Sequence, residues 1–252
     1  MIGPEVEIGK GVRIGPHVFI ERDTKVGTDV RISKGAVLGT DPQDLKYGGE
    51  RTFLEIGPRT RIREFATINR GTAASGITKV GADALIMSYA HIAHDCRIGD
   101  HVVLANSVNM GGHVEIGDWA TVGGLTPIHQ FVRIGCHSMV GGASRIDRDV
   151  APYTIAAGSP AFSFGINRIG LERRGFDSDS ISQLKIAFRQ IFRAEIPLRI
   201  ALDQIEDEQH IKEVRELIRF IRTSERGIIP SRSGAASSTD PNIDPHGRPS
   251  PT

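Results

Sequence analysis

The chain has 252 residues, of which 39% are hydrophobic and 24% are charged, an ordinary balance for a globular protein. Its formal net charge is +1, which gives no bulk attraction to nucleic acid or to an anionic membrane. The two cysteines, Cys96 and Cys136, fall in no metal-binding spacing and fit a reducing compartment. No apolar run approaches the roughly 20 residues that span a bilayer. We therefore expect a cytoplasmic protein that neither binds nucleic acid nor inserts into a membrane.

An aliphatic residue recurs at every sixth position from Ile2 to Ile146, with breaks at residues 40–55 and 71–79. The repeat comprises 22 hexads, of which 13 have Gly directly after the aliphatic residue, and the position four after it is nearly always small. A period of six matches neither an α-helix nor an alternating strand. It predicts a coil with three flat faces, in which the aliphatic side chain points inward and Gly makes the corner. Three hexads then form one coil of 18 residues, and the coils stack by parallel strand pairing.

The repeat divides the chain into segments. We predict a parallel β-helix over residues 1–152, with ejected loops at 40–55 and 71–79, and an irregular connecting segment at 153–176. A small helical domain follows at 177–228, where Asp177 begins a helix that ends near Phe192 and a second helix runs from Ile211 to Ile221. Residues 229–252 form a disordered tail. The first hexad has no capping segment, so we expect either that partner chains cover it or that the natural protein begins upstream.

Histidines gather at one place on the predicted coil. Residues 18 apart stack on one face, so His94 lies under Gly112, and Gly112 under Gln130. Three further histidines are close to this column: His91, His113 and His129. None of the four occupies an interior position, so all should point outward on one edge. Three other outward histidines carry no such cluster: His17, His101 and His137.

His94 is suited to remove a proton from a hydroxyl at neutral pH. Asp95 could orient its ring, and the Gly112 amide could stabilise a developing oxyanion. Cys96 should point inward, which leaves no serine or cysteine nucleophile beside the base. The set fits direct attack of an alcohol on a thioester. Two alternatives stay open, namely incidental surface histidines and a zinc site that includes His91 and His94.

Four motifs resemble those of the UDP-N-acetylglucosamine acyltransferases of lipid A synthesis. They are Gln43-Asp44-Leu45-Lys46-Tyr47, Ala90-His91-Ile92-Ala93-His94-Asp95-Cys96, Ile128-His129-Gln130-Phe131 and Gly170-Leu171-Glu172-Arg173-Arg174-Gly175-Phe176. The similarity covers about residues 2–226, including both loops. It implies an all-β left-handed parallel β-helix of hexapeptide repeats followed by a small α-helical C-terminal domain.

The resemblance also implies an activity. The family transfers a 3-hydroxyacyl chain from acyl carrier protein to the 3-hydroxyl of UDP-N-acetylglucosamine, as a homotrimer with sites between adjacent prisms and without a cofactor or metal. The implied catalytic residues are His94 as the base, Asp95 as its assistant and Gly112 as the oxyanion donor. The implied substrate-binding residues are Asp44, Lys46, His91, His113, His129, Gln130, Gly142, Asn167, Arg173 and Arg174.

Some of these residues receive a specific role. Asn167, Arg173 and Arg174 would meet the nucleotide, because the planar guanidinium of Arg can donate two bonds to a phosphate. Gly142 matches the position that sets acyl-chain length, where a small residue implies a longer chain. Acyl carrier protein is acidic, and the basic side chains of Lys185, Arg189 and Arg193 could form its docking surface.

The sequence departs from the family pattern at three positions that bear on nucleotide binding. Asn69 and Pro160 stand where relatives have histidine, and Ile169 replaces an acidic residue.

Rival functions remain. A 3-amino sugar could be the acceptor instead of the 3-hydroxyl. The later N-acyltransferase of the same pathway is disfavoured because its nucleotide-binding domain has no counterpart here. A zinc-dependent prism of the carbonic anhydrase type and a non-catalytic scaffold are the remaining alternatives.

Overall fold

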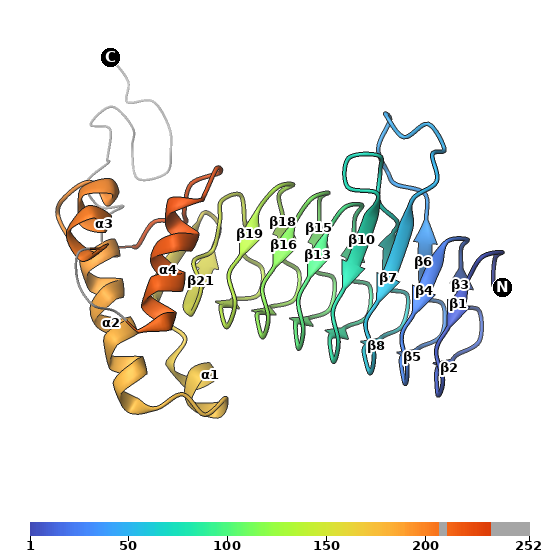
Figure 1. Ribbon diagram of the computed structural model, residues 1–252, viewed down its shortest axis with the longest axis horizontal. Helices are drawn as coiled ribbons and strands as arrows, with labels where there is room; N and C mark the ends of the chain where they lie inside the picture. The colour runs from blue at the N-terminus through green and yellow to red at the C-terminus, as the bar shows by residue number, and fades with distance from the viewer. Residues whose placement is uncertain (207–210, 233–252) are drawn as a thin grey trace, which may run out of the picture.

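The computed structural model describes residues 1–206 and 211–232, which form a three-sided prism with helices packed on its C-terminal end (Figure 1). The chain winds around the prism axis in the left-handed sense, with one short strand on each face per coil (Figure 1). The fold is therefore a left-handed parallel β-helix, as the hexapeptide period and the family resemblance predicted.

Each prism face is a sheet whose strands come from successive coils. The seven-stranded sheet contains β1 (Glu7–Ile8), β4 (Thr24–Val26), β7 (Phe53–Ile56), β10 (Ile77–Val80), β13 (Arg97–Ile98), β16 (Glu115–Ile116) and β19 (Arg133–Ile134). The nine-stranded sheet contains β2 (Arg13–Ile14), β5 (Arg31–Ile32), β8 (Arg61–Ile62), β11 (Leu85–Ile86), β14 (Val103–Leu104), β17 (Thr121–Val122), β20 (Met139–Val140), β21 (Thr154–Gly158) and β22 (Ala161–Ile166). The six-stranded sheet contains β3 (Phe19–Ile20), β6 (Val37–Thr40), β9 (Thr67–Asn69), β12 (His91–Ile92), β15 (Asn109–Met110) and β18 (Pro127–Ile128).

The register follows the predicted 18-residue coil. Ile92 pairs with Met110, and Met110 pairs with Ile128, so the aliphatic residues of one sheet form a column inside the prism. From Ile20 to Ile146 the repeating aliphatic residues are at most 4% exposed and the small residues lie between them, whereas Ile2, Ile8 and Ile14 of the first coil are 38–52% exposed. Burial of each large aliphatic side chain stabilises the folded state by roughly 1.5–3 kcal/mol, and the contributions of many equivalent positions add together.

The expected role of glycine at the corners was wrong. Within residues 1–206 and 211–232, eighteen residues other than glycine have positive φ, and with few exceptions they lie three positions after the aliphatic residue, as at Asp95, His113 and Phe131. The glycine directly after the aliphatic residue is needed for a different reason. A Cβ on Gly81 would lie 2.5 Å from the backbone carbon of Gly99 in the next coil, so the close stacking of coils excludes a side chain there.

Two loops leave the prism at the same edge, one after β6 at residues 41–52 and one after β9 at residues 70–76 (Figure 1). The loops are joined to each other. The buried Arg70 donates from Nε to the Tyr47 hydroxyl at 3.1 Å and from Nη2 to the carboxylate of Asp41. Glu50 accepts a bond from the Ala73 N–H at 3.2 Å. Asn69 donates to the Thr40 hydroxyl at 2.9 Å and so fixes the base of the first loop.

The C-terminal part contains more regular structure than predicted. The connecting segment, expected to be irregular, holds the antiparallel pair β21 and β22 and the helix α1 (Arg168–Arg173). Helices α2 (Ser178–Phe192) and α4 (Lys212–Arg222) agree with the prediction, and Asp177 caps α2 through a 2.7 Å bond from the Ser180 N–H. Helix α3 (Leu198–Glu206) was not predicted. The helices share a second core with the prism end, around Leu184, Leu217 and Tyr153.

The predicted disordered tail begins too early. Residues 229–232 are described, Ile229 is 2% exposed, and Ser231 forms a parallel bridge with Ser163 of β22. The rest of that predicted tail, 233–252, lies outside the described residues. Among the helices that are described, none has the length and apolar character needed to cross a membrane.

Candidate active site

The predicted catalytic residues lie on the edge between the six-stranded and seven-stranded sheets. We call it the histidine edge and define it by His94, Asp95, His113 and Phe131. His94 and Asp95 follow β12, and His113 and Phe131 occupy the equivalent corner in the next two coils. Both ejected loops leave the prism at this edge. The histidine edge is therefore where the rigid coil meets the irregular segments.

Asp95 is fully enclosed, and its carboxylate is surrounded by donors from the second loop. Thr72 donates from its hydroxyl to Oδ2 at 2.7 Å and from its N–H to Oδ1 at 3.1 Å. Ser75 donates its N–H to Oδ1 at 3.3 Å and also its hydroxyl. Burial alone would raise the pKa of Asp95, but the bonds from Ser75, His94 and Thr72 outweigh it and hold the pKa below its usual value. Asp95 is therefore ionised at neutral pH.

The ionised Asp95 determines which nitrogen of His94 carries the proton. Nδ1 of His94 lies 2.7 Å from Oδ2 of Asp95, and a carboxylate only accepts hydrogen bonds. Nδ1 must therefore be the donor, which leaves the lone pair on Nε2. The imidazole side chain is only 13% exposed, so this lone pair is held in a largely enclosed position.

Gly112 packs directly against the His94 ring, as the 18-residue stacking predicted. A Cβ at Gly112 would lie 2.4 Å from Cε1 and 2.6 Å from Nε2 of His94. Within residues 1–206 and 211–232, the Gly112 N–H donates to no acceptor. A free base nitrogen and a free backbone donor therefore lie side by side, which is the pairing that addition to a carbonyl group requires.

The other histidines of the edge differ in their surroundings. His113 meets His94 edge-on at 5.2 Å and stacks on Phe131 at 4.6 Å. His91 faces Thr67, with 2.7 Å between Nδ1 and the hydroxyl, and burial lowers its pKa, with a smaller contribution from His94. His129 and Gln130 are exposed one coil further along. A partly aromatic wall thus extends from His94 toward the C-terminal end.

Cys96 points into the prism, as predicted. Its side chain is buried, and burial raises the pKa of the thiol to about 12. A neutral, enclosed thiol is a poor nucleophile. In the described part of the chain, the His94 ring is hydrogen-bonded to no serine or cysteine side chain.

The remaining predicted residues do not all meet at this edge within one chain. Asp44 and Lys46 lie on the first loop, close to the histidine edge through its contacts with the second loop. Gly142 lies on another edge, after β20. Asn167 and Arg174 lie on the third edge, where Asn167 donates to the His137 carbonyl at 2.9 Å and the Arg174 guanidinium lies 5.4 Å from the Trp119 ring centre. Arg173 is exposed at the end of α1.

The edge that holds Asn167 and Arg174 carries an aromatic column, which we call the tryptophan edge and define by His101, Trp119, His137 and Tyr153. The rings of His101 and Trp119 stack at 3.8 Å, and His137 stacks between Trp119 and Tyr153. Two histidines that looked isolated in the sequence are thus parts of one ordered column.

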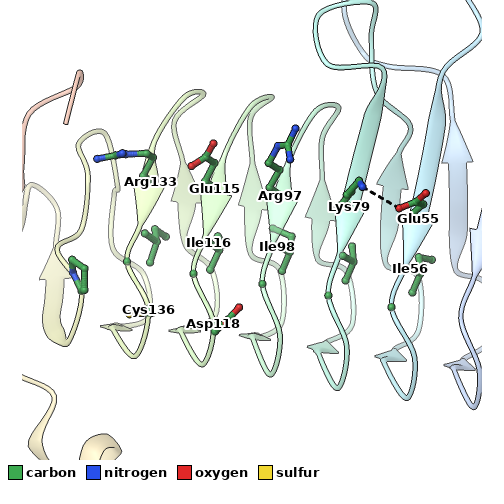
Figure 2. A pocket seen from close by; sticks show the side chains of 18 of the residues that line it. Glu55, Ile56, Lys79, Arg97, Ile98, Glu115, Ile116, Asp118, Arg133 and Cys136 are labelled. Atoms are coloured by element: carbon green, nitrogen blue, oxygen red, sulfur yellow. Dashed lines mark ion pairs between the residues drawn. The ribbon is translucent and has the colours of Figure 1, made fainter. Parts of the chain in front are cut away.

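The face between the histidine and tryptophan edges holds a groove of about 810 Å³ (Figure 2). Charged side chains of both signs project beside it in a row along the seven-stranded sheet, and Lys79 is ion-paired with Glu55 at 3.3 Å (Figure 2). Among the described residues that line this groove, none belongs to the predicted site. The groove is therefore separate from the His94–Asp95 pair.

The prism and the base beside a free backbone amide define the class of protein, the hexapeptide-repeat transferases. The profile of the family described as bacterial transferase hexapeptide (six repeats) matches residues 77–112. The profile described as UDP N-acetylglucosamine O-acyltransferase, domain 2, matches residues 149–229, which include the helices.

Known proteins of one family are similar over most of the chain. An acyl-[acyl-carrier-protein]–UDP-N-acetylglucosamine O-acyltransferase of Burkholderia mallei is 48% identical over 194 residues, 75% of this chain and 74% of the relative. The crystal structure of the Francisella novicida UDP-N-acetylglucosamine acyltransferase superposes with a TM-score of 0.88 at 35% identity, covering 94% of this chain and 87% of that one. The O-acyltransferase of Moraxella catarrhalis gives a TM-score of 0.81 at 44% identity, with 91% and 92% covered. The chain belongs to the UDP-N-acetylglucosamine O-acyltransferase family and is an acyltransferase.

Some residues of the site were not predicted from the sequence. Phe131 could have been found, because it lies 18 residues after His113 and must stack beside it. Thr72 and Ser75 could not, because the second loop interrupts the period and the register no longer says what its residues contact.

Proposed function

We propose that this protein transfers a 3-hydroxyacyl chain from acyl carrier protein to the 3-hydroxyl of UDP-N-acetylglucosamine, with His94 as general base. One observation carries the proposal. His94 is fixed through Nδ1 to an ionised, buried carboxylate, while its basic Nε2 lies beside the free N–H of Gly112. The names of the relatives, which are acyltransferases of UDP-N-acetylglucosamine, supply the substrate class.

The reaction follows from this arrangement. The sugar hydroxyl attacks the thioester carbonyl carbon as its proton passes to Nε2 of His94, and the carbonyl oxygen becomes an oxyanion that accepts a bond from the Gly112 N–H. The tetrahedral intermediate then collapses and breaks the carbon–sulfur bond, and the departing thiolate of the carrier takes the proton from Nε2 to become a thiol. Asp95 holds the imidazole in the required tautomer and stabilises the imidazolium that forms. Because Cys96 is neutral and enclosed, direct attack is favoured over an acyl-enzyme.

The distribution of the substrate residues supports a homotrimer. One prism presents His94, Arg174 and Gly142 on three different edges, and a rigid prism cannot bring its own edges together. If these residues bind one substrate, the histidine edge of one chain must face other edges of a neighbouring chain. A closed ring of three parallel prisms satisfies this requirement at every site.

The substrate groups can be assigned to the surfaces that suit them. Lys46 on the exposed first loop, and Arg173 and Arg174 near α1, are suited to the negatively charged nucleotide. Gly142 presents no side chain, which leaves the surface beside it free for a long acyl chain. Lys185, Arg189 and Arg193 are exposed on and next to α2, where they can meet an acidic carrier protein.

Mass spectrometry tests the proposal. Purified protein would be incubated with UDP-N-acetylglucosamine and a panel of 3-hydroxyacyl carrier proteins, with His94→Ala as the control. We expect a singly acylated UDP-sugar from the wild-type protein and none from the variant, and the mass reports the chain length. If a well-folded wild-type protein forms no product with any donor, the proposed reaction is wrong.

Two rivals have specific tests. Ligand atoms of His94, Asp95 and His113 lie within 4.8 Å of one another, a spacing that could hold a metal ion. The carboxylate of Asp95 already accepts several hydrogen bonds, and one of them comes from Nδ1 of His94. This arrangement suits a general base better than a zinc ligand. Elemental analysis should therefore find no stoichiometric zinc. The other rival is transfer to a 3-amino sugar. A competition assay that supplies the 3-amino analogue together with the 3-hydroxyl UDP-sugar tests it, because the preferred acceptor will give most of the product.

A further inference from the structure

We propose that the second ejected loop is the positioning element of the active site, and that Thr72 and Ser75 act through Asp95 to fix the tautomer and basicity of His94. This inference rests on the proposed function, because it concerns the same base. It adds two residues that contact neither His94 nor Gly112.

The loop supplies almost every donor that the carboxylate receives. Thr72 and Ser75 each give one hydroxyl and one N–H, while Nδ1 of His94 is the one donor from the prism among the residues that the structure describes. The Asp95 N–H is bonded separately to the Thr78 hydroxyl at 2.8 Å, which fixes the backbone but not the carboxylate. Without the loop, the prism would hold a carboxylate without enough donors to remain ionised.

The loop is built to hold these donors still. Gly76 has a φ of +75° and donates its N–H to the Thr72 carbonyl at 2.7 Å, which closes a tight turn. A Cβ on Gly71 would lie 2.3 Å from the Ile77 backbone nitrogen, so the two ends of the loop are in contact. Glu50 of the first loop braces it through the Ala73 N–H. A short, braced loop places hydroxyls more reproducibly than a free one.

The effect on His94 has a definite sign. Besides Asp95, the titratable groups of the described residues that approach His94 are His113 from the next coil and His91 from β12, the strand that precedes His94, and Nε2 of His113 lies 3.6 Å from the Asp95 carboxylate. The Ser75 hydroxyl takes up part of the negative charge of Asp95. When that bond is lost, more of the charge acts on the imidazolium of His94, so His94 keeps its proton to a higher pH.

The pH profile of Ser75→Ala tests the inference in the full-length protein. We expect kcat/KM at neutral pH to fall about tenfold, mostly through kcat. The acidic limb of the pH–rate profile, where protonation of His94 removes activity, should move up by about half to one pH unit. Ser75→Thr keeps the hydroxyl and should retain the wild-type limb. Ser33→Ala is the matched control, because its hydroxyl makes no hydrogen bond among the described residues.

A second readout needs no turnover. Nitrogen NMR of the His94 imidazole, assigned with His94→Ala, reports its tautomer and its pKa directly. In a Thr72→Val/Ser75→Ala double variant we expect the tautomer with the proton on Nε2 to appear. An acidic limb of Ser75→Ala that stays at the wild-type pH, or an unchanged tautomer in a folded double variant, would overturn the inference. If instead the wild-type protein is inactive but the NMR changes occur, the proposed function fails and the positioning role stands.

Discussion

Replacing Gly112 by Ala tests the contact between the backbone and the base. The new Cβ would lie 2.4 Å from Cε1 and 2.6 Å from Nε2 of His94. Carbon atoms normally approach to roughly 3.5–4.0 Å, so the ring must move by about 1 Å. The backbone at Gly112 is not in the left-handed region, so the substitution adds no backbone strain, and its cost comes from the contact alone.

A displacement of that size moves Nε2 away from the attacking hydroxyl and separates the base from the oxyanion donor. A misplacement of 1 Å costs about 100-fold, and loss of one oxyanion donor costs about 100- to 1000-fold. We therefore expect kcat/KM of Gly112→Ala to fall roughly 100- to 1000-fold, which corresponds to about 2.7–4 kcal/mol of transition-state stabilisation. Steady-state assays of the acyl transfer measure the loss.

Thermal unfolding of the double variant separates the clash from a general defect. Gly112→Ala should lower the free energy of unfolding by about 1–3 kcal/mol through overpacking. In a His94→Ala background the ring is absent, so the same substitution should be nearly neutral for stability. The reasoning would be refuted if Gly112→Ala kept most of the wild-type activity, or if its destabilisation persisted in the double variant.

Three further predictions concern other parts of the molecule. If each site combines the histidine edge of one chain with the tryptophan edge of the next, co-expressed His94→Ala and Arg174→Ala chains, inactive alone, should regain about one third of the sites in mixed trimers, or about one quarter of all sites after random assembly; no recovery in assays of the purified mixture would argue against shared sites. Burial, and secondarily Arg174, lower the pKa of His137 from 6.5 to about 4, so its contribution to stability is present above pH 6.5 and is lost as the pH falls toward 4. Melting temperatures of His137→Asn should therefore decline less over that range than those of the wild type, and equal declines would contradict this role. Iodoacetamide should leave Cys96 unmodified in the folded protein, as peptide mass mapping can check, because its thiol is buried and its pKa is raised to about 12.

The periodic part of the chain was predictable to the level of single contacts. The spacing of six defines the prism, and the stacking of residues 18 apart places Gly112 on His94. This worked because a solenoid converts distance along the sequence into position in space by one fixed rule. The same rule would have placed Phe131 on His113, and Trp119 between His101 and His137.

Prediction was poorer wherever the period stops. The hexapeptide repeat ends at Val150. The sequence did not predict the hairpin of β21 and β22, the helix α3 or the packing of residues 229–232. Their order comes from contacts with the prism end, such as the bridge from Ser231 to Ser163, which local composition does not encode. The role assigned to glycine also failed, because backbone crowding between coils is a property of the stack and not of one hexad.

By itself, the sequence determined the prism, the direction of its side chains and the stacking of Gly112 on His94, because each follows from a repeat that every coil obeys. Only the tertiary structure decided that Thr72 and Ser75 surround Asp95, that the carboxylate is ionised, and that His94 keeps its lone pair on Nε2. Those facts depend on where a loop of irregular backbone folds back against the prism. Hydrogen bonds between residues 20 or more positions apart set that path, and no local pattern records them.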